Sequence, residues 1–539
     1  MTGPALGAHQ MARGLGLALS ATTVLAVFSC GRSRGNADQL PEGAAATPPA
    51  CAQIFSTNDL HGQLLASEQP WSEGRLVGGS AVMAGYVRQA ALEDPDCPVF
   101  VVSGGDMMQG TLLSNFTGGE ATIAAMNAVG YDVAALGNHE WDWGEEVLRE
   151  RMRQAEFPVL GANVFVKGTD RHPEWLDPWT IVEKDGVRVG FVGATTTSTP
   201  TSALPSMVAA YDFRSIAGAL DRYIPEVRAA GADFVVAVMH EGAFCNADAC
   251  SGEALQELSA VTERFDYAVT GHTHSRLMTE VKTPHGPVPV VQAWANSTAF
   301  GLGEIRRAAG GDVSAGTSEI VQTYADEIAA DSAVAAVVAE YAATVEEIAA
   351  RVVTELEASL PKPRRGGFAI GRIIADAQRA LTGADIAITN NGGIRRPLGA
   401  GPVTFRDLFE LQPFGNTMQI LDVSGETLLR TLEQGIREDG LDLQISGVEV
   451  VYDQAAARGS RIISAAGPDG LEVEPTRMYR MAVNNFLAEG GSGYTALLDA
   501  ANVERLDLVD LDALIAYLQQ QPRPLPIPSE PRWTDIGGP

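Results

Sequence analysis

The chain has few basic residues. It contains 38 lysines and arginines against 67 aspartates and glutamates, a formal net charge of -29 over 539 residues. So acidic a surface repels the phosphate backbone of DNA and RNA, which argues against a nucleic-acid polymer as the main partner. A small phosphorylated substrate remains compatible with this charge, because bound cations dominate the field inside a site.

Long apolar runs are also absent, apart from a short one near the start. Residues 14–28 are apolar but too few to span a bilayer, which is typical of a signal peptide, here 1–30. The sequence VFSCG around Cys30 resembles a bacterial lipobox, although Phe28 is unusual there. We expect an exported protein of the periplasm or cell surface, held at the membrane by acyl chains on Cys30. The alternative is a soluble exported protein that is cleaved nearby.

Cysteine is scarce as well, with five in the whole chain. Beyond Cys30 the even number that remains supports two disulfides in an exported protein. Cys245 and Cys250 are close enough to close a small loop. Cys51 opens the first expected strand and Cys97 immediately precedes the second. If these strands are parallel neighbours, both sulfurs lie at one end, so we predict the pairs Cys51–Cys97 and Cys245–Cys250.

A chain of this length exceeds a single core, so more than one domain is expected. Residues 31–50 are rich in Gly, Ala, Pro and Thr and predict a flexible tether. Residues 51–323 and 360–522 predict two folded domains. Between them, 324–359 are rich in Ala and Glu without Gly or Pro, which favours one long linking helix. The proline-rich tail, 523–539, is expected to be extended or mobile.

Apolar runs alternate with helical patterns through 51–323, and this alternation predicts α/β layering. The expected strands include 99–102, 133–136, 187–192, 234–238, 267–269 and 288–291. The expected helices include 80–91, 120–128, 145–155 and 216–229. In the second domain we expect a helix over 369–381 and strands over 386–389, 417–423 and 478–483. Ligands in such sheets gather beyond the carboxyl ends of the strands.

Histidine is rare too, with eight residues, and most of them follow apolar runs in short polar clusters. The clusters are TNDLHG, GGDMMQG, GNHEWD, HEG and GHTH. Their oxygen and imidazole donors suit Zn, Mn or Fe better than a thiolate site would. The candidate ligands are Asp59, His61, Asp106, Asn138, His240, His272 and His274. So many donors exceed the needs of one ion and predict two divalent ions that share a carboxylate, roughly 3.5–4 Å apart.

Asp106 is the best candidate for the shared ligand, because its carboxylate has two oxygens. Asp59 and His61 would bind one ion with His274. Asn138 would bind the other with His240 and His272. A lone residue of this kind is weak evidence, but the ordered set at strand ends makes coincidence a poor explanation.

His139 and Asp142 are three residues apart, a spacing that lets a carboxylate reach an imidazole on a helical turn. A histidine oriented in this way can stabilise developing charge or protonate a leaving oxygen. Asn138 would assist it. The alternative is that Asp142 caps the helix that begins near residue 143.

The clusters resemble those of the bacterial 5′-nucleotidase and UDP-sugar hydrolase family, a branch of the calcineurin-like metallophosphatases. The resemblance continues into the second domain, where NNGGIR, PFG and NFLA are similar to the family's substrate-binding segments. It implies a four-layer metallophosphatase sandwich, a linking helix and a smaller α/β nucleoside-binding domain. It also implies that the seven candidate ligands hold two metal ions and that His139 with Asp142 forms the catalytic dyad.

The second domain supplies candidate substrate residues. Phe414 and Phe486 can sandwich a base, and Asn390 offers an amide to a base edge or sugar. Arg395 and Arg364 can hold a phosphate through forked hydrogen bonds. Core packing is the alternative for each phenylalanine. Two positions depart from the family pattern: Asn391 replaces a loop glycine, and Ser492 replaces an aspartate that binds the ribose hydroxyls.

These features predict an exported, lipid-anchored phosphohydrolase that removes the 5′-phosphate from AMP-like nucleotides by attack of metal-bound water. The same site could instead serve as a nucleotide-sugar pyrophosphatase, a 2′,3′-cyclic-nucleotide phosphodiesterase or a sulfur-ester hydrolase. An alternative of another class is a non-catalytic nucleotide-binding lipoprotein. The sequence leaves the oligomeric state open.

Overall fold

The computed structural model describes residues 50–69, 71–246, 249–309 and 311–537. The predicted signal peptide, the predicted acylation site Cys30 and the tether up to residue 49 lie outside these residues. None of the helices in the described part of the chain is long and apolar enough to cross a membrane.

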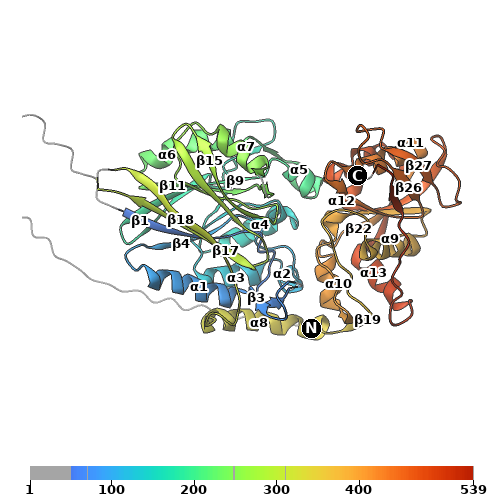
Figure 1. Cartoon of the computed structure of the whole chain (residues 1–539), viewed down its shortest axis with the longest axis horizontal. Helices are drawn as coiled ribbons and strands as arrows, with labels where there is room; N and C mark the ends of the chain where they lie inside the picture. The colour runs from blue at the N-terminus through green and yellow to red at the C-terminus, as the bar shows by residue number, and fades with distance from the viewer. Residues whose placement is uncertain (1–49, 70, 247–248, 310, 538–539) are drawn as a thin grey trace, which may run out of the picture. The chain divides into compact units, whose positions relative to one another are not determined.

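The N-terminal domain contains two mixed six-stranded sheets (Figure 1). The first has the order β18-β17-β1-β4-β5-β6, formed by Val313–Gln322, Ala299–Arg307, Ala50–Thr57, Val99–Ser103, Val133–Ala135 and Val159–Leu160. The second has the order β15-β16-β14-β11-β9-β8, formed by Arg276–Thr283, Gly286–Ala293, Tyr267–Val269, Phe234–His240, Val187–Thr195 and Trp179–Lys184. β1, β4, β5 and β6 are parallel, and so are β9, β11, β14 and β16.

The sheets pack face to face, because alternate strand residues point to opposite faces. Ile54 of β1 and Phe191 of β9 belong to the apolar core between the sheets. Their neighbours point outward: Phe55 packs with α1 and α3, Ser80–Glu93 and Glu120–Val129. Val192 packs with α6 and α7, Ile216–Ala229 and Glu253–Ala260. The order helix, sheet, sheet, helix is the predicted four-layer sandwich, and the expected strands and helices of this domain are confirmed.

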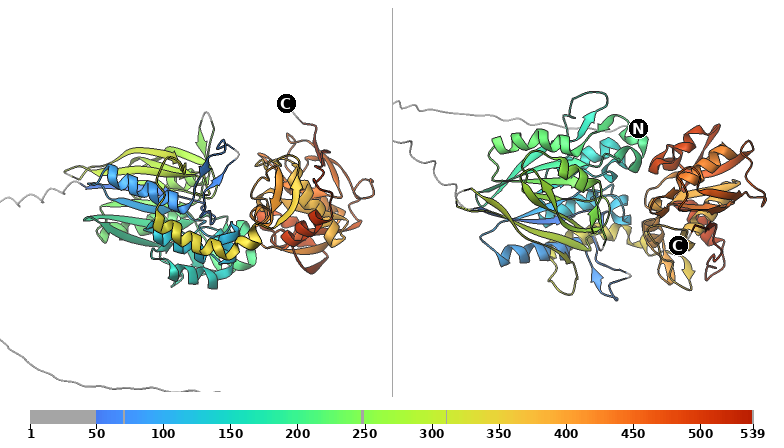
Figure 2. Two further views of the ribbon diagram at one scale, coloured as in Figure 1. Left: turned by 90° about the horizontal axis from the view of Figure 1, so that it is seen from below. Right: turned by 45° about the horizontal axis from the view of Figure 1, so that its top comes forward.

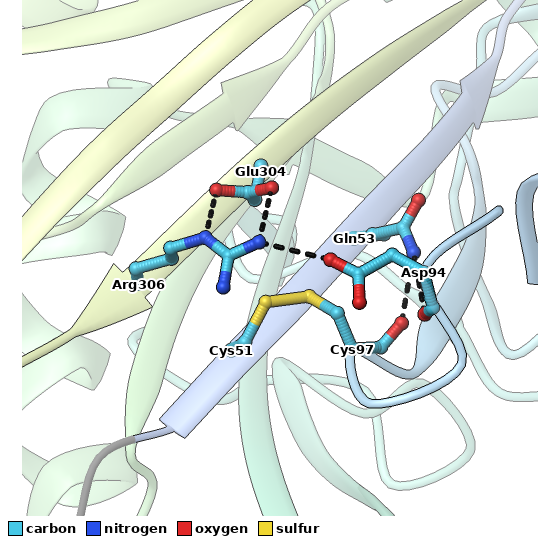
Figure 3. Close-up of a disulfide and its surroundings, with 6 residues drawn as sticks. All are labelled: Cys51, Gln53, Asp94, Cys97, Glu304 and Arg306. Atoms are coloured by element: carbon cyan, nitrogen blue, oxygen red, sulfur yellow. Dashed lines mark hydrogen bonds and ion pairs between the residues drawn. A yellow bond between two sulfur atoms is a disulfide. The ribbon is translucent and has the colours of Figure 1, made fainter.

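Both predicted disulfides are present. Cys51 in β1 pairs with Cys97 just before β4, and the two strands are parallel neighbours (Figure 3). Gln53 reinforces this corner, since its Nε2 donates to the Cys97 carbonyl at 2.9 Å. Cys245 and Cys250 pair across the short strands β12 and β13, Phe244–Cys245 and Cys250–Ser251.

The single long helix predicted for 324–359 is wrong in extent. Helix α8 covers Ser332–Ala349, and the side chain of Asp331 caps its start. A strand, β19, follows over Val352–Leu356 and pairs with β21, Gly401–Thr404. The run Val352-Val353-Thr354 is β-branched and favours a strand. The helix prediction missed this run because it relied on the Ala and Glu content of the whole segment. α8 packs against α1 and α3 of the first domain (Figure 2).

The second domain is built on a five-stranded sheet of order β25-β20-β28-β22-β29. These strands are Leu443–Ser446, Ile386–Asn390, Met478–Asn484, Thr417–Ser424 and Asn502–Val509. Helix α9, Ala369–Thr382, packs against β20, β25 and α13, Asp510–Gln519. Helix α11, Gly425–Gln434, shares another apolar cluster with β20, β22 and β28. The predicted helix and strands of this domain are confirmed.

The described residues of the tail are extended, which is one of the two expected alternatives, and they pack against the second domain. Strand β30, Trp533–Asp535, pairs in parallel with β26, Glu449–Tyr452. Leu525 and Trp533 are buried. Apolar side chains among the prolines thus attach the tail to the second domain.

Candidate metal centre and substrate cleft

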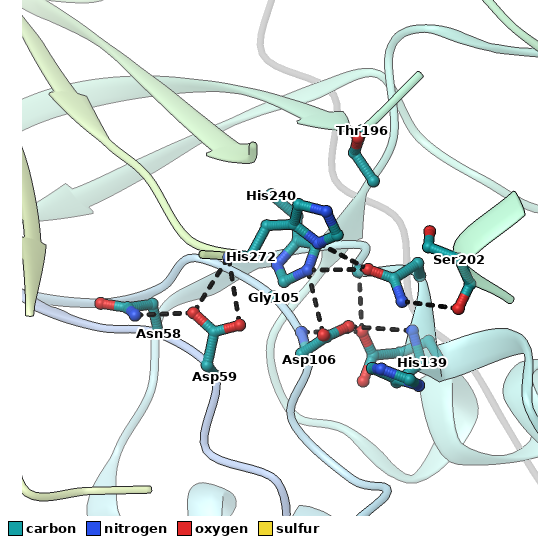
Figure 4. A network of polar contacts seen from close by, with 12 residues as sticks. Asn58, Asp59, Gly105, Asp106, His139, Thr196, Ser202, His240 and His272 are labelled. Atoms are coloured by element: carbon teal, nitrogen blue, oxygen red, sulfur yellow. Dashed lines mark hydrogen bonds and ion pairs between the residues drawn. The ribbon is translucent and has the colours of Figure 1, made fainter. Parts of the chain in front are cut away.

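The candidate ligands lie where parallel strands end. Asp59 follows β1, Asp106 follows β4 and Asn138 follows β5. In the second sheet His240 ends β11, and His272 follows β14. Because the carboxyl ends of these strands meet at one edge of the sandwich, side chains far apart in the sequence converge (Figure 4).

The donors form two groups of three, Asp59 with His61 and His274, and Asp106 with His240 and His272. Within each group the ligand atoms lie within 4.8 Å of one another. In the first group His274 Nε2 is 3.2 Å from Asp59 Oδ1 and 3.0 Å from His61 Nε2. Such spacing lets three donors contact one ion.

Asn138 and Asp106 complete the arrangement. Asn138 Oδ1 lies 3.1 Å from His240 Nε2 and 3.0 Å from His272 Nδ1, which places it in the second group. Asp106 Oδ2 is 3.0 Å from His240 Nε2 and 3.8 Å from His61 Nε2, one from each group. The carboxylate predicted to be shared therefore faces both sets of donors.

Backbone carbonyls set the tautomers of two ligands. His61 Nδ1 is 2.7 Å from the Gln109 carbonyl, and His240 Nδ1 is 2.8 Å from the Gly104 carbonyl. A carbonyl only accepts, so each Nδ1 donates its proton, and in the neutral imidazole each Nε2 offers its lone pair to a cation.

The charges also favour cations. Burial opposes ionisation of Asp59, but nearby His274 outweighs it and lowers the pKa of Asp59 to about 2. Asp106 is likewise buried, and His240 and His139 hold its pKa well below the usual range. Two ionised carboxylates, an amide oxygen and imidazole nitrogens form a donor set that fits divalent metal ions.

Five of the candidate ligands have left-handed backbone conformations. The φ angles are 50° at Asp59, 48° at His61, 51° at Asp106, 72° at His272 and 51° at His274. A residue with a Cβ atom adopts this region at a cost of roughly 1–2 kcal/mol. Such geometry clusters at functional sites, where the surrounding fold holds it in place.

Glu140 supports the centre, and sequence reasoning assigned it no role. The side chain is 1% exposed, and among the described residues its carboxylate accepts hydrogen bonds from backbone N–H groups only. The donors are Asp106 at 3.0 Å, Met107 at 2.7 Å and Gly137 at 2.7 Å, with Met108 more distant at 3.3 Å. Glu140 thus ties the loop after β4 to the loop after β5. Its position inside the GNHEWD cluster was the one sequence feature that could have indicated this supporting role.

Asn58 supports the other group in a similar way. Its Nδ2 donates to Asp59 Oδ2 at 2.7 Å, and its Oδ1 accepts from the Ala293 N–H at 2.7 Å. The side chain therefore fixes the carboxylate of Asp59 against the end of β16.

His139 and Asp142 are in contact as expected from their spacing. His139 Nδ1 lies 2.7 Å from Asp142 Oδ2, and the His139 N–H donates to Asp106 Oδ1 at 2.9 Å. Burial opposes a charge on His139, but Asp142 and Asp106 raise its pKa overall. The capping alternative is wrong, because Trp143 is the N-cap of α4, Gly144–Gln154, and no side chain caps that helix.

A cleft of about 360 Å³ is lined in part by the candidate metal ligands Asp106, Asn138, His272 and His274. Its volume lies within the usual range for small-molecule sites, about 300–1,000 Å³. Four of the predicted substrate residues line it: Asn390, Arg395, Phe414 and Phe486. The Phe414 ring stacks on His139 with centroids 5.4 Å apart, and Arg395 Nη2 is 3.3 Å from His61 Nε2.

The structure does not bring Arg364 to this cleft. Its exposed side chain pairs with Asp439 at 3.3 Å and lies over the ring of Phe244 at 4.0 Å. These two contacts direct the guanidinium away from the predicted phosphate position.

Asn390 and Ser492 lie together in the cleft. Asn390 Nδ2 donates to Ser492 Oγ at 3.2 Å. Within the described residues, the buried Asn390 Oδ1 has no hydrogen-bond partner, which leaves one acceptor free for a ligand.

Two family models match parts of the chain. The model described as the 5′-nucleotidase C-terminal domain matches residues 342–499. A model described as the bacterial capsule synthesis protein PGA_cap matches residues 95–253.

Similar proteins extend the likeness over both domains. Protein UshA of Escherichia coli is 27% identical over 512 residues, which cover 87% of this chain and 90% of that protein. Endonuclease YhcR of Bacillus subtilis is 27% identical over 507 residues, and the chain spans 40% of its length. The crystal structure of a 5′-nucleotidase precursor from Thermus thermophilus superposes with a TM-score of 0.80 at 28% identity. It covers 91% of this chain and 100% of that one.

The layered N-terminal domain and the α/β C-terminal domain define the class of the protein as a two-domain hydrolase of the metallophosphatase type. Within that class, the chain is similar to bacterial 5′-nucleotidases in its C-terminal family model and, over both domains, in its relatives.

Proposed function

We propose that the protein removes the 5′-phosphate from nucleotides such as AMP. The observation that carries this proposal is the position of Asp106 Oδ2 between two groups of metal donors, at the wall of a cleft lined by Arg395, Phe414 and Phe486. The name of the similar Thermus thermophilus protein, a 5′-nucleotidase precursor, supports the same substrate class.

The candidate ligands would hold two divalent ions, one at Asp59, His61 and His274 and the other at Asn138, His240 and His272. Asp106 would contact both. Ions bound there supply positive charge for the phosphate oxygens and activate water for attack on phosphorus.

The side chains of the cleft then have distinct roles. Arg395 binds the phosphate, because its half-buried guanidinium lies beside His61 and makes no ion pair with any described residue. Phe414 and Phe486 offer aromatic faces to the base, and Asn390 Oδ1 accepts from a base or sugar donor. Arg364 is omitted from this scheme, since it lies outside the cleft.

His139 moves the proton. Asp142 holds its Nδ1, which leaves Nε2 to donate to the departing 5′-oxygen. The bond from phosphorus to the 5′-oxygen breaks while a water oxygen bonds to phosphorus. The products are a nucleoside and inorganic phosphate.

Export is part of the proposal. Two disulfides among the described residues are typical of an oxidising compartment and support a location outside the cytosol. An acyl anchor on Cys30 remains a prediction, which mass spectrometry of the membrane-extracted protein can test.

A substrate panel tests the proposed reaction. Purified protein would be supplied with Mn or Zn, and its metal content measured. The products followed would be phosphate from AMP, UMP with glucose 1-phosphate from UDP-glucose, 3′-AMP from 2′,3′-cyclic AMP, and sulfate from a thiosulfate conjugate. We expect AMP to have the highest kcat/KM. Preference for another substrate would reassign the reaction, and AMP binding without turnover would support a non-catalytic binding protein.

A further inference from the structure

A second, smaller cavity adjoins the substrate cleft. It measures about 90 Å³ and shares only His274 and Arg395 with the cleft of about 360 Å³. Sites for drug-sized molecules usually measure about 300–1,000 Å³, so this cavity has room for a small ion and not for a nucleoside.

The walls of this cavity carry an excess of positive charge. Lys362, Arg395 and Arg396 line it together with one carboxylate, Glu410. Glu410 pairs with Arg396, so its negative charge is already engaged. Neither Lys362 nor Arg395 forms an ion pair with any described residue.

Lys362 is the distinctive residue of the cavity. Its half-buried ammonium makes no hydrogen bond or ion pair with any residue in the described part of the chain. Burial and the nearby Arg395 lower the pKa of Lys362 to about 8, as expected for a cation without a partner. A lysine presents three donors on a compact charge, and an arginine presents a planar fork. Together they suit a small tetrahedral anion.

The position of the cavity indicates which anion. Arg395 and His274 belong to both the cavity and the cleft, and His61 also faces the cavity. We propose that the cavity binds inorganic phosphate, the product of the proposed reaction, after it leaves the metal-ligand cluster. This inference rests on the proposed function. It implies that phosphate can depart while the nucleoside still fills the cleft.

Calorimetric titration with inorganic phosphate tests the site on protein treated with a chelator, so that metal ions make no contribution. We expect wild type to bind phosphate and Lys362→Ala to bind about ten-fold more weakly or less, because a charge-assisted hydrogen bond is lost. Lys362→Met should show the same loss, and Lys362→Arg should retain binding. Lys282→Ala, which removes an exposed lysine of β15, is the matched control and should behave as wild type.

Absence of phosphate binding to the metal-free wild type would overturn the inference, and so would equal affinity in wild type and both uncharged variants. Thermal melts would show that each variant is folded. The titration contains neither nucleotide nor metal, so its result is separate from the AMP assay. A protein that hydrolyses AMP but fails this titration contradicts only the phosphate site, whereas one that binds phosphate but hydrolyses no nucleotide contradicts the proposed function.

Discussion

Glu140 shows how a single buried acid can set the geometry of a cluster of candidate metal ligands. Glutamine at this position keeps the shape but has one oxygen in place of two, so backbone N–H groups now meet an amide donor. Leaving buried donors unpaired costs about 1–3 kcal/mol each, and we expect Glu140→Gln to lower the free energy of unfolding by roughly 2–4 kcal/mol. Urea denaturation measures this change, and elemental analysis should show weaker metal retention.

Glu146→Gln is the matched control, because Glu146 is exposed in the first turn of α4. We expect its stability and metal content to stay close to those of wild type. Equal stability of the two variants would show that the carboxylate of Glu140 does not hold the loops after β4 and β5.

We expect His139 to contribute to catalysis at the leaving group and to contribute little to the stability of the fold. His139→Ala should reduce kcat by at least ten-fold, because general acid catalysis typically contributes about 10²–10⁴-fold. Its metal content and melting temperature should change little, since the candidate ligands stay in place. His285→Ala, at an exposed histidine, should leave kcat unchanged. More than a tenth of wild-type kcat in His139→Ala would contradict the proposed proton transfer.

At this scale the sequence identifies candidate ligands better than it identifies the residues that support them. Asp106 and His240 stand out because polar residues follow apolar strands. The left-handed backbone conformation at Asp59 and Asp106 cannot be predicted from the residue pattern, because it depends on loops that form only in the folded domain. Arg364 illustrates the opposite error: its residue type suits phosphate, but Asp439 and Phe244 engage it elsewhere.

At the scale of elements, strands are well predicted where buried runs are continuous, as in β11 and β14, because both faces of a parallel sheet are covered. The segment 324–359 shows where prediction of secondary structure from composition fails. Its composition favours a helix throughout, yet β19 forms because Val353 and Leu356 are buried when it pairs with β21. Tertiary pairing overrides local propensity there.

Asp510, at the start of α13, allows a test of how a buried carboxyl group affects the pH dependence of stability. Burial raises the pKa of Asp510 from 3.8 to about 7, so the folded state keeps a proton that the unfolded state releases between these values. The contribution of this group to the free energy of unfolding is therefore present below pH 3.8 and is lost as the pH rises through 7. Asp510→Asn cannot ionise and should be more stable than wild type at pH 8, by at most about 4 kcal/mol.

Chemical denaturation at pH 8 and at pH 4 measures this difference, which should be largest at pH 8 and close to zero at pH 4. Asp512→Asn, an exposed aspartate in the same helical turn, is the control and should show little pH-dependent gain. An Asp510→Asn protein less stable than wild type at pH 8 would mean that the helix N-terminus and Asn416 stabilise the ionised carboxylate after all.

At the scale of the whole molecule, the site depends on contacts between residues hundreds of positions apart. Arg395 reaches His61, and Phe414 stacks on His139, although each pair joins different domains of the sequence. Composition and periodicity carry no information on such contacts, so only the family resemblance placed these residues in one site. The cavity around Lys362 could not be predicted from the sequence either, because its walls also come from distant parts of the chain.

Removal of metal ions should therefore destabilise the protein as well as inactivate it. The unfolded chain cannot assemble donors from five strand ends, so ions bind the folded state and stabilise it by about 2.7 kcal/mol at a hundred-fold excess over Kd. We expect a chelator to lower Tm and added Mn or Zn to restore it. Asp106→Asn, whose amide shares an ion poorly, should show a smaller shift, while Asp312→Asn at an exposed aspartate should match wild type. An unchanged Tm in chelator, with elemental analysis confirming loss of metal, would mean that the donors hold their positions through the backbone of the fold alone.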